Sequence, residues 1–282
     1  MKAWILILLI VLGAGALCLF YGFFLEPRWI KVRRRVISAP GGDYQGKSIL
    51  FFSDIHVGKR TRQKDLDRQV RKIMGENADA VIFGGDLVEE ATPLWDPDFR
   101  QMVIGSLARI KAPLGQWAIL GNHDTEAPRY RAWAAGVLES AGFTVLENEG
   151  AEIAGLPVWA FADSHHANPV FDRASLITAM AEKKEGEDPF TLYLIHESDW
   201  FPQNMPAEGP GLVLCGHSHQ GQVTLFGLPL IRPAGAKTYW RGSYRLNDHL
   251  SMMIRAWLGT VHIHARFFAR PDLLLIRFGE KV

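Results

Sequence analysis

Cysteine is scarce in this chain, and neither sign of charge dominates it. Only two of the 282 residues are cysteines: Cys18 lies in an apolar segment, and Cys215 ends an expected strand. A disulfide between them is not expected, so nothing in the sequence argues for an oxidising compartment. The formal net charge of +1 does not favour a nucleic-acid binder, because such proteins usually carry a basic face. We therefore expect no nucleic-acid partner.

The sequence also lacks an internal repeat, a low-complexity tract and a clear linker after residue 48. Its 48% hydrophobic and 22% charged residues are typical of a folded protein. The length suffices for one sizeable α/β domain or for two small ones. We predict one folded domain over residues 48–282. An anchor over residues 1–27 precedes it, followed by a basic juxtamembrane segment with a first strand over residues 28–47.

Charged side chains are absent from residues 3–25. A helix needs about 20 apolar residues to cross a bilayer, so this stretch predicts a membrane-spanning helix. Trp4 and Trp29 bracket it, as interfacial anchors do. The alternative is a signal peptide that is cleaved at the small residues Ala14-Gly15-Ala16, although strongly apolar sequence continues well beyond them.

Basic residues indicate how this segment is oriented. Only Lys2 precedes it, whereas five basic residues follow it: Arg28, Lys31, Arg33, Arg34 and Arg35. Positive charge stays on the cytoplasmic side of a membrane. We therefore expect a single-pass protein of the inner (cytoplasmic) membrane, with its folded domain in the cytoplasm. The basic run also attracts anionic headgroups, although a topology signal is the simpler interpretation.

Apolar runs and stretches of helical spacing alternate along the rest of the chain. Strands are expected at residues 32–38, 49–52, 80–83, 117–120, 158–161, 192–195, 212–215, 223–226, 252–255 and 273–278, with shorter ones near 145 and 153. Helices are expected at 65–74, 99–110, 130–138 and 174–184. This order predicts an α/β fold in which a largely buried mixed sheet packs on a second sheet, with helices outside.

Five of the short apolar runs end in side chains that bind metal ions. They lead to Asp54 and His56, to Asp86, to Asn122 and His123, to His196, and to His217 and His219. In open α/β sheets, ligands bind beyond the carboxyl ends of the strands, so parallel strands would deliver these residues to one edge. Carboxylate, amide and imidazole groups suit Mn²⁺, Fe or Zn²⁺. The pattern therefore predicts a phosphoesterase site with two divalent metal ions.

The ordered set of motifs resembles the calcineurin-like metallophosphoesterase superfamily over roughly residues 48–278. The set is Asp54-x-His56, Gly85-Asp86, Gly121-Asn122-His123-Asp124, His196 and Gly216-His217-Ser218-His219. Two further stretches, Gly221-Gln222-Val223 and Ala269-Arg270-Pro271-Asp272-Leu273, resemble the bacterial membrane-associated branch. That branch contains YaeI- and YkuE-type phosphodiesterases and some UDP-2,3-diacylglucosamine pyrophosphatases of lipid A synthesis. Ser198 and Gln220 depart from it, since proline and glycine are frequent there.

The resemblance implies a four-layer α-β-β-α sandwich of two mixed sheets, with the catalytic domain over residues 48–282. It also implies a role for each motif residue. Asp54, His56 and His219 hold one divalent ion, Asn122, His196 and His217 hold the second, and Asp86 bridges both. His123 stabilises the transition state and protonates the leaving oxygen, with Asp124 as a candidate orienter of its ring. A metal-bound hydroxide attacks phosphorus in line, without a covalent intermediate.

Residues beside the motifs are candidate substrate contacts. Arg60 follows the first motif and is expected either to meet the phosphate or to lie in solvent. His165 and His166 are expected in a loop, where they either border the pocket and contact substrate or face water. His262 and His264 alternate with apolar residues, which indicates one face of a strand or of an extended loop.

Three functions remain open at this point. The first is a membrane-anchored dimetal phosphohydrolase for a phosphodiester or pyrophosphate near the bilayer, with a lipid-linked substrate such as UDP-2,3-diacylglucosamine. The anchor favours this function, because tethering raises the local concentration of such a substrate. The second is a soluble nucleotide or cyclic-nucleotide phosphodiesterase. The third is a non-catalytic metal-binding scaffold, which the full set of ligands and His123 disfavours.

Overall fold

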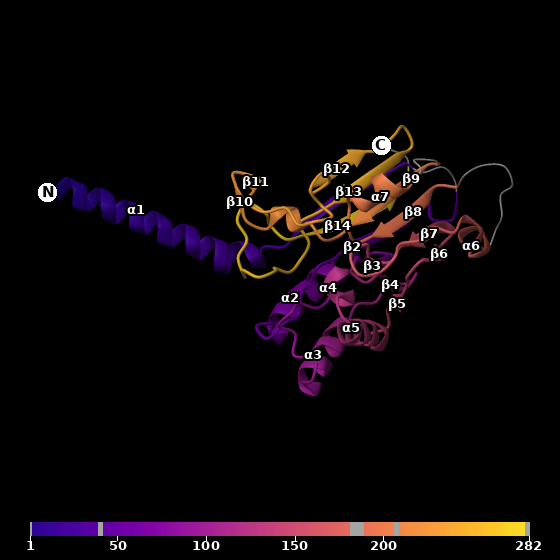
Figure 1. Ribbon diagram of the computed structural model, residues 1–282, viewed down its shortest axis with the longest axis horizontal. Coiled ribbons are helices and arrows are strands. Elements are labelled where there is room, and N and C mark those ends of the chain that lie inside the picture. Colours follow the sequence, from indigo (N-terminus) through magenta and orange to yellow (C-terminus); the bar gives the residue numbers. More distant parts are fainter. Residues whose placement is uncertain (1, 39–41, 181–188, 206–208, 280–282) are drawn as a thin grey trace.

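An N-terminal helix projects from a layered domain in the computed structural model (Figure 1). The structure describes residues 2–38, 42–180, 189–205 and 209–279. Helix α1 (Lys2–Phe20) continues as a π-helical turn η1 (Tyr21–Leu25) and a 3₁₀ turn η2 (Glu26–Arg28). The apolar span covers Ala3–Arg28, and none of its most apolar window is buried against the described residues. It is long and apolar enough to cross a membrane, as the sequence predicted.

The first sheet has the strand order β1-β14-β2-β3-β4-β5. Strands β2 (Ser48–Phe52), β3 (Ala80–Phe83), β4 (Gln116–Ala118) and β5 (Thr144–Val145) are parallel. Strand β14 (Asp272–Phe278) is antiparallel to β2, and β1 (Lys31–Ile37) is parallel to β14. Helices α2 (Gln63–Met74), α3 (Pro97–Leu107) and α5 (Pro128–Ser140) cover the outer face of this sheet, where their apolar sides form one core.

The second sheet has the order β12-β13-β9-β8-β7-β6. Its centre is parallel and consists of β13 (Leu250–Ile254), β9 (Gly211–Cys215), β8 (Thr191–Ile195) and β7 (Leu156–Ala160). The edge strands β12 (Gly242–Arg245) and β6 (Glu149–Ile153) are antiparallel to their neighbours. Helices α6 (Arg173–Thr178) and α7 (Trp200–Asn204) contribute to the core on its outer face. A separate hairpin pairs β10 (Thr224–Leu225) with β11 (Leu228–Pro229).

The central strands explain why the sequence shows continuous apolar runs instead of alternation. In β2, Ile49 and Phe51 enter the core between the two sheets, whereas Leu50 and Phe52 pack toward the helices. In β9, Leu214 faces the core between the sheets, and Cys215 faces the outer core. Both faces of each central strand are thus buried, as expected for parallel strands that are covered on both sides. The predicted four-layer α-β-β-α sandwich of two mixed sheets is confirmed.

Some element boundaries differ from those expected. Helix α3 ends at Leu107 instead of residue 110, and β4 ends at Ala118, before the expected residue 120. Helix α6 ends at Thr178, and residues 181–184 of the expected helix lie outside the described residues. His262 and His264 lie in a bent loop rather than in a strand. Apart from the earlier end of β4, these differences do not move the strand ends that carry the predicted ligands.

Candidate metal centre

The predicted ligands converge from both sheets onto one edge. Asp54 and His56 follow β2, Asp86 follows β3, and His196 follows β8. Asn122 begins the short helix α4 (Asn122–Thr125), and His219 begins the 3₁₀ turn η3 (His219–Gly221). Among the described residues, three groups place ligand atoms within 4.8 Å of one another: Asp54–His56–His219, His56–Asp86–His123 and Asp86–His196–His217. Residues up to 165 positions apart in sequence thus share one cluster.

Backbone strain is concentrated in this cluster. Five of the seven predicted ligands have a positive φ: Asp54 (56°), His56 (49°), Asp86 (59°), His217 (68°) and His219 (47°). A non-glycine residue rarely adopts this conformation, which costs on the order of 1–3 kcal/mol when the surrounding structure imposes it. Such strain accumulates at functional sites, where it aims side chains that a regular strand would direct elsewhere.

Two motif glycines leave room for the ligands. A Cβ atom at Gly121 would lie 2.3 Å from Asp86 Oδ1, and one at Gly216 would lie 2.5 Å from Ser53 Oγ. Neither distance is tolerable between non-bonded heavy atoms. The residues before Asn122 and His217 are therefore glycines, because a side chain at either position would collide with neighbouring residues of the site.

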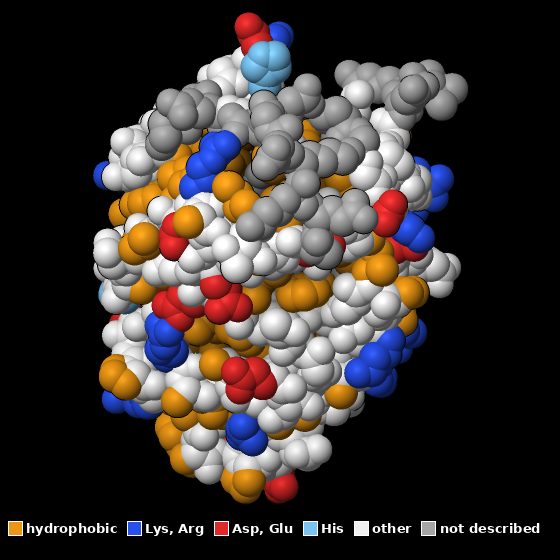
Figure 2. Space-filling view, turned by 90° about the vertical axis from the view of Figure 1, so that its right-hand side faces the viewer, with side chains coloured by type: hydrophobic (Ala, Val, Ile, Leu, Met, Phe, Trp, Pro, Cys, Tyr) orange, Lys and Arg blue, Asp and Glu red, His pale blue; other side chains and the backbone are white. Residues whose placement is uncertain are grey.

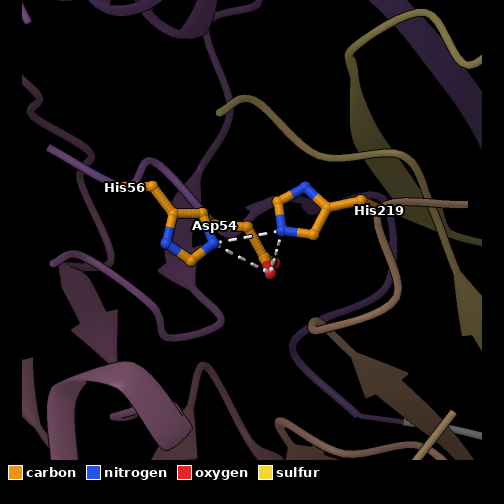
Figure 3. Close-up of side chains that lie close together, drawn as sticks. All are labelled: Asp54, His56 and His219. Atoms are coloured by element: carbon orange, nitrogen blue, oxygen red, sulfur yellow. Dashed lines mark hydrogen bonds and ion pairs between the residues drawn. The ribbon is translucent and has the colours of Figure 1, made fainter. Parts of the chain in front are cut away.

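The first half of the cluster contains two imidazole nitrogens that face each other (Figure 3). His56 Nδ1 lies 3.0 Å from the Val88 carbonyl oxygen, which can only accept, so this nitrogen carries the hydrogen. The lone pair of His56 Nε2 then points to His219 Nε2 at 3.0 Å. Asp54 Oδ1 lies 3.3 Å from the same His219 nitrogen. A backbone carbonyl that fixes the tautomer of a histidine is typical of metal ligation, so this donor set fits a divalent cation.

The second half of the cluster repeats this arrangement. His196 Nδ1 donates to the Gly84 carbonyl at 2.7 Å, and its buried Nε2 is directed into the cluster. That nitrogen lies 3.0 Å from Asp86 Oδ2. His217 Nε2 donates to the Ala234 carbonyl at 2.6 Å, so its Nδ1 lone pair faces Asn122 Oδ1 at 2.8 Å. Two acceptors in such proximity fit a cation between them.

The charges of the cluster favour cation binding. Burial favours the neutral form of Asp86, but His196 and His123 outweigh it and hold the Asp86 pKa well below its ordinary value. Burial opposes protonation of His196, but Asp86 outweighs it and raises the His196 pKa. Burial, together with His196, lowers the pKa of His217 to about 4. The carboxylates of Asp54 and Asp86 are therefore ionised at neutral pH, and a metal ion bound at His196 would displace a proton.

His123 lies beside the cluster with its ring partly buried. Its backbone N–H donates to Asp86 Oδ1 at 2.9 Å, and its ring lies edge-on to the His56 ring, with 5.0 Å between centroids. The buried Nδ1 atom has no hydrogen-bond partner in the described part of the chain. Burial lowers the pKa of His123. The ring is thus held at the cluster with a nitrogen that is not committed to another group.

Asp124 occupies a different position from the one expected. Its Oδ1 accepts hydrogen bonds from the backbone N–H groups of Leu87 (2.9 Å) and Val88 (3.0 Å), and its Oδ2 accepts one from Gly121 (3.1 Å). Among the described residues, the hydrogen bonds of this carboxylate thus go to backbone donors, and none joins it to the His123 ring. It ties the turn that carries Asp86 to the turn that carries His123.

Replacing Asp124 with asparagine is expected to destabilise the protein, because the amide nitrogen cannot accept from Gly121. One lost acceptor in a buried site costs about 1–3 kcal/mol.

Burial, reinforced by Asp86, raises the pKa of Asp124 to about 7. The folded wild type therefore binds this proton more tightly than the unfolded chain, so its stability falls as pH rises from about 4 to 7. Urea unfolding in chelator should show a weaker pH dependence for the variant; an unchanged slope would contradict this assignment.

The candidate substrate contacts lie at different distances from the cluster. The ring of His165 packs edge-on to His217, with 5.3 Å between centroids, and His166 lies one ring further out at 6.2 Å from His165. Both side chains are exposed, and Asp163 accepts from their backbone N–H groups. Arg60 is exposed in the turn after β2. Of the two histidines, His165 therefore borders the site more closely.

Two buried polar residues at the site escaped the sequence analysis. Arg266 is fully buried, with Nη2 3.3 Å from His219 Nδ1. Glu197 is also buried and accepts from the Ser164 backbone N–H at 2.8 Å. Glu197 directly follows a ligand in sequence, which is a usable signal. Arg266 lies 47 residues from His219 in a stretch without periodicity, so nothing in the sequence indicates its position.

A cavity of about 730 Å³ opens among the loops that follow three of the ligand motifs. Lys59, Glu90 and Arg129 contribute charged walls. Trp133 contributes an apolar wall, although it is buried and stacks on Phe99 with 6.3 Å between centroids. Basic and apolar walls together suit a ligand with an anionic part and an apolar part.

Known proteins resemble this chain in sequence. Residues 47–221 match the family described as calcineurin-like phosphoesterase. The chain is 28% identical to the uncharacterised metallophosphoesterase YkuE of Bacillus subtilis over 93% of this chain and 91% of that protein. It is 25% identical to the phosphodiesterase YaeI of Escherichia coli, over 91% of each. A shorter match of 31% identity to the UDP-2,3-diacylglucosamine pyrophosphatase LpxG of Chlamydia trachomatis covers 40% of this chain and 34% of that protein.

Proposed function

This chain belongs to the calcineurin-like phosphoesterase family and is a metal-dependent phosphoesterase, and we propose that it is a membrane-anchored hydrolase. The hydrolase uses two divalent ions to cleave a phosphodiester or pyrophosphate bond in a lipid-linked substrate. One observation carries the proposal. The Asp86 carboxylate lies 3.0 Å from His196 Nε2 and 3.6 Å from His56 Nε2. It therefore faces both halves of the cluster, as a bridging ligand must.

Each half of the cluster is assigned one ion, either Mn²⁺, Fe or Zn²⁺. Asp54, His56 and His219 hold the first, Asn122, His196 and His217 hold the second, and Asp86 is shared. When bound, such a pair of ions activates a water molecule and neutralises charge on phosphoryl oxygens. The carboxylate oxygens, imidazole nitrogens and amide oxygen of this set suit these metals, and no cysteine lies among the ligands.

His123 supplies the proton that the leaving oxygen requires. Its backbone hydrogen bond to Asp86 holds the ring beside the bridging position, and its Nδ1 lacks a partner among the described residues. A bound phosphate anion stabilises the protonated ring and opposes the effect of burial on its pKa. The ring can then donate to the departing oxygen and return to its neutral form. His165, at the edge of the cluster, is assigned to substrate contact, with His166 and Arg60 as outer candidates.

Residues 1–27 are assigned as a single-pass anchor in the inner membrane. The catalytic domain is assigned to the cytoplasmic side. The excess of basic residues after the span supports this orientation. Two members of the basic run are engaged within the domain: Arg33 pairs with Asp272, and Arg34 pairs with Glu76. A topology signal thus accounts for this run better than a dedicated lipid site does.

The lipid-linked substrate is supported by three observations of different kinds. The N-terminal helix is long and apolar enough to span a membrane, the cavity combines basic and apolar walls, and part of the chain is similar to a pyrophosphatase of an acylated nucleotide sugar. UDP-2,3-diacylglucosamine is the most specific candidate with these features. A soluble nucleotide or cyclic-nucleotide diester is the alternative substrate, because its hydrolysis would need the two-metal site but no contact with a lipid.

Substrate turnover by the full-length protein in detergent tests this proposal. With Mn²⁺ present, we expect UMP release from UDP-2,3-diacylglucosamine and its loss when a chelator is added. Good turnover of bis-p-nitrophenyl phosphate without UMP release would favour the soluble diester. A metal-loaded protein that hydrolyses neither compound would instead support the non-catalytic scaffold.

A further inference from the structure

Large apolar side chains are exposed on the hairpin that follows the metal ligands. The β10–β11 hairpin begins five residues after His219, and Phe226 at its tip is 84% exposed. Its exposed neighbours belong to the hairpin, to the segment after it and to the loop before β14: Leu225, Leu228, Leu230, Ile231 and Phe268. A contiguous apolar patch of this kind usually marks an interaction surface in a folded protein.

Aromatic contacts connect this hairpin to the end of the anchor. The ring of Phe226 stacks on Phe268 with 5.8 Å between centroids, and Phe268 packs edge-on to Phe267 at 4.8 Å. Phe267 in turn packs edge-on to Tyr21, in the turn after α1, at 6.0 Å. The patch therefore continues without a break from the last turns of the apolar span.

Hydrogen bonds fix this connection. The Gly22 carbonyl oxygen accepts from the Arg266 backbone N–H at 2.9 Å. The buried Glu26 carboxylate accepts from the backbone N–H groups of Phe268 (3.0 Å) and Ala269 (2.6 Å). The hairpin joins the same assembly, because Thr224 N–H donates to the Phe267 carbonyl at 2.9 Å. Anchor, loop and hairpin thus form one held unit at the end of the domain from which α1 emerges (Figure 1).

The tip of the hairpin combines exposure with strain. Phe226 and Gly227 form the two-residue turn, with φ values of 50° and 89°. Asparagine, aspartate or glycine is usual at the first of these positions, because a positive φ strains a bulky side chain. Phe268, its stacking partner, also has a positive φ, of 52°. In water, both the positive φ of Phe226 and the exposure of its ring are unfavourable.

Cationic and tryptophan side chains border the patch. The guanidinium groups of Arg232 and Arg241 lie over the ring of Trp240, at 4.9 and 4.8 Å from its centroid. Arg241 also donates to the Gly227 carbonyl in the turn, at 2.9 Å. Tryptophan and arginine around an apolar tip suit the headgroup layer of an anionic bilayer. The opposite end of the molecule differs, since there apolar side chains are interspersed with acidic and basic ones (Figure 2).

We propose that the β10–β11 hairpin and the Phe268 loop form a second contact with the bilayer that α1 crosses, with Phe226 inserted among the acyl chains. This inference rests on the proposed anchor. A lipid surface is favoured over a second copy of this chain because the patch continues directly into the membrane span. Since His219 lies in the segment that leads to the hairpin, the contact holds the metal centre against the bilayer surface, where a lipid-linked phosphoester presents its headgroup.

Depth-dependent fluorescence in nanodiscs tests this contact in the full-length protein. An environment-sensitive fluorophore is attached to cysteine in the double variant Cys18→Ser, Phe226→Cys, and the discs contain phosphatidylglycerol and hold one protein copy each. Asp248→Cys in the same background is the control, because Asp248 is exposed and precedes β13. Strand β13 is parallel to β9, so its start lies at the end of the sheet away from the metal centre.

The label at position 226 is expected to be quenched by lipid-borne quenchers and protected from aqueous iodide, whereas the label at 248 shows the reverse. Equal iodide access at both positions would overturn the proposal. Protection only in discs that hold two copies would also overturn it, in favour of self-association. A label on the native Cys18 separately reports insertion of α1, so failure of the anchor and failure of the hairpin contact are distinguished. Neither readout depends on phosphoester turnover.

Discussion

Replacing Asp86 with alanine is expected to lower kcat/KM by at least about 10³-fold, since loss of a ligand shared by two cations removes several kcal/mol of transition-state stabilisation. Both halves of the cluster should lose affinity, because Asp86 faces His196 and His56 at 3.0 and 3.6 Å. Metal content of the purified variant and turnover of bis-p-nitrophenyl phosphate at saturating Mn²⁺ provide the measurement.

Asp248→Ala is the matched control for this change, because it removes an exposed aspartate at the end of the second sheet away from the cluster. It should retain two metal ions per chain and wild-type turnover. If Asp86→Ala also retained both ions, the bridging assignment would be wrong, and the 86 carboxylate would serve only to hold the His123 backbone N–H.

Replacing His123 with alanine is expected to lower kcat by about 10²–10⁴-fold, the usual contribution of a positioned acid or base. Its position beside His56 and Asp86 also makes it a candidate metal ligand on distance alone. The two roles differ in metal content, because a proton donor can be removed while both ions stay bound. We expect the variant to bind the same number of ions as the wild type.

The leaving group provides a sharper readout of this role. A diester with an alkyl leaving group needs protonation more than one with p-nitrophenol, so His123→Ala should impair the alkyl substrate by a larger factor. His249→Ala removes an exposed histidine and should leave both substrates unaffected. Equal losses on the two substrates would indicate that His123 stabilises charge without donating a proton.

The order of layers was predictable because each central strand is buried on both faces. Apolar runs such as Ile49 to Phe52 have no polar face. A run this short and this apolar is typical of a strand that is buried on both faces. The convergence of Asp54, Asp86 and His196 was predictable for a related reason. Parallel strands place their carboxyl ends at one edge, so distance along the chain does not matter.

Other features of the site depend on contacts between distant residues, which no local sequence pattern predicts. Asp124 was a candidate orienter of His123, but its carboxylate accepts hydrogen bonds from the backbone N–H groups of Leu87 and Gly121. Arg266 contacts His219 through a loop without periodicity. The positive φ values of the ligands are likewise imposed by the assembled site, because aspartate and histidine tolerate that conformation better than most residues but still adopt it in few positions.

Anomalous diffraction from crystals of the Mn²⁺-loaded protein, measured at the manganese edge, tests the two-ion centre most directly. The account predicts two peaks about 3.5–4 Å apart on either side of the Asp86 carboxylate, one beside His56 and the other beside His196. A single peak there, or peaks away from these residues, would contradict it.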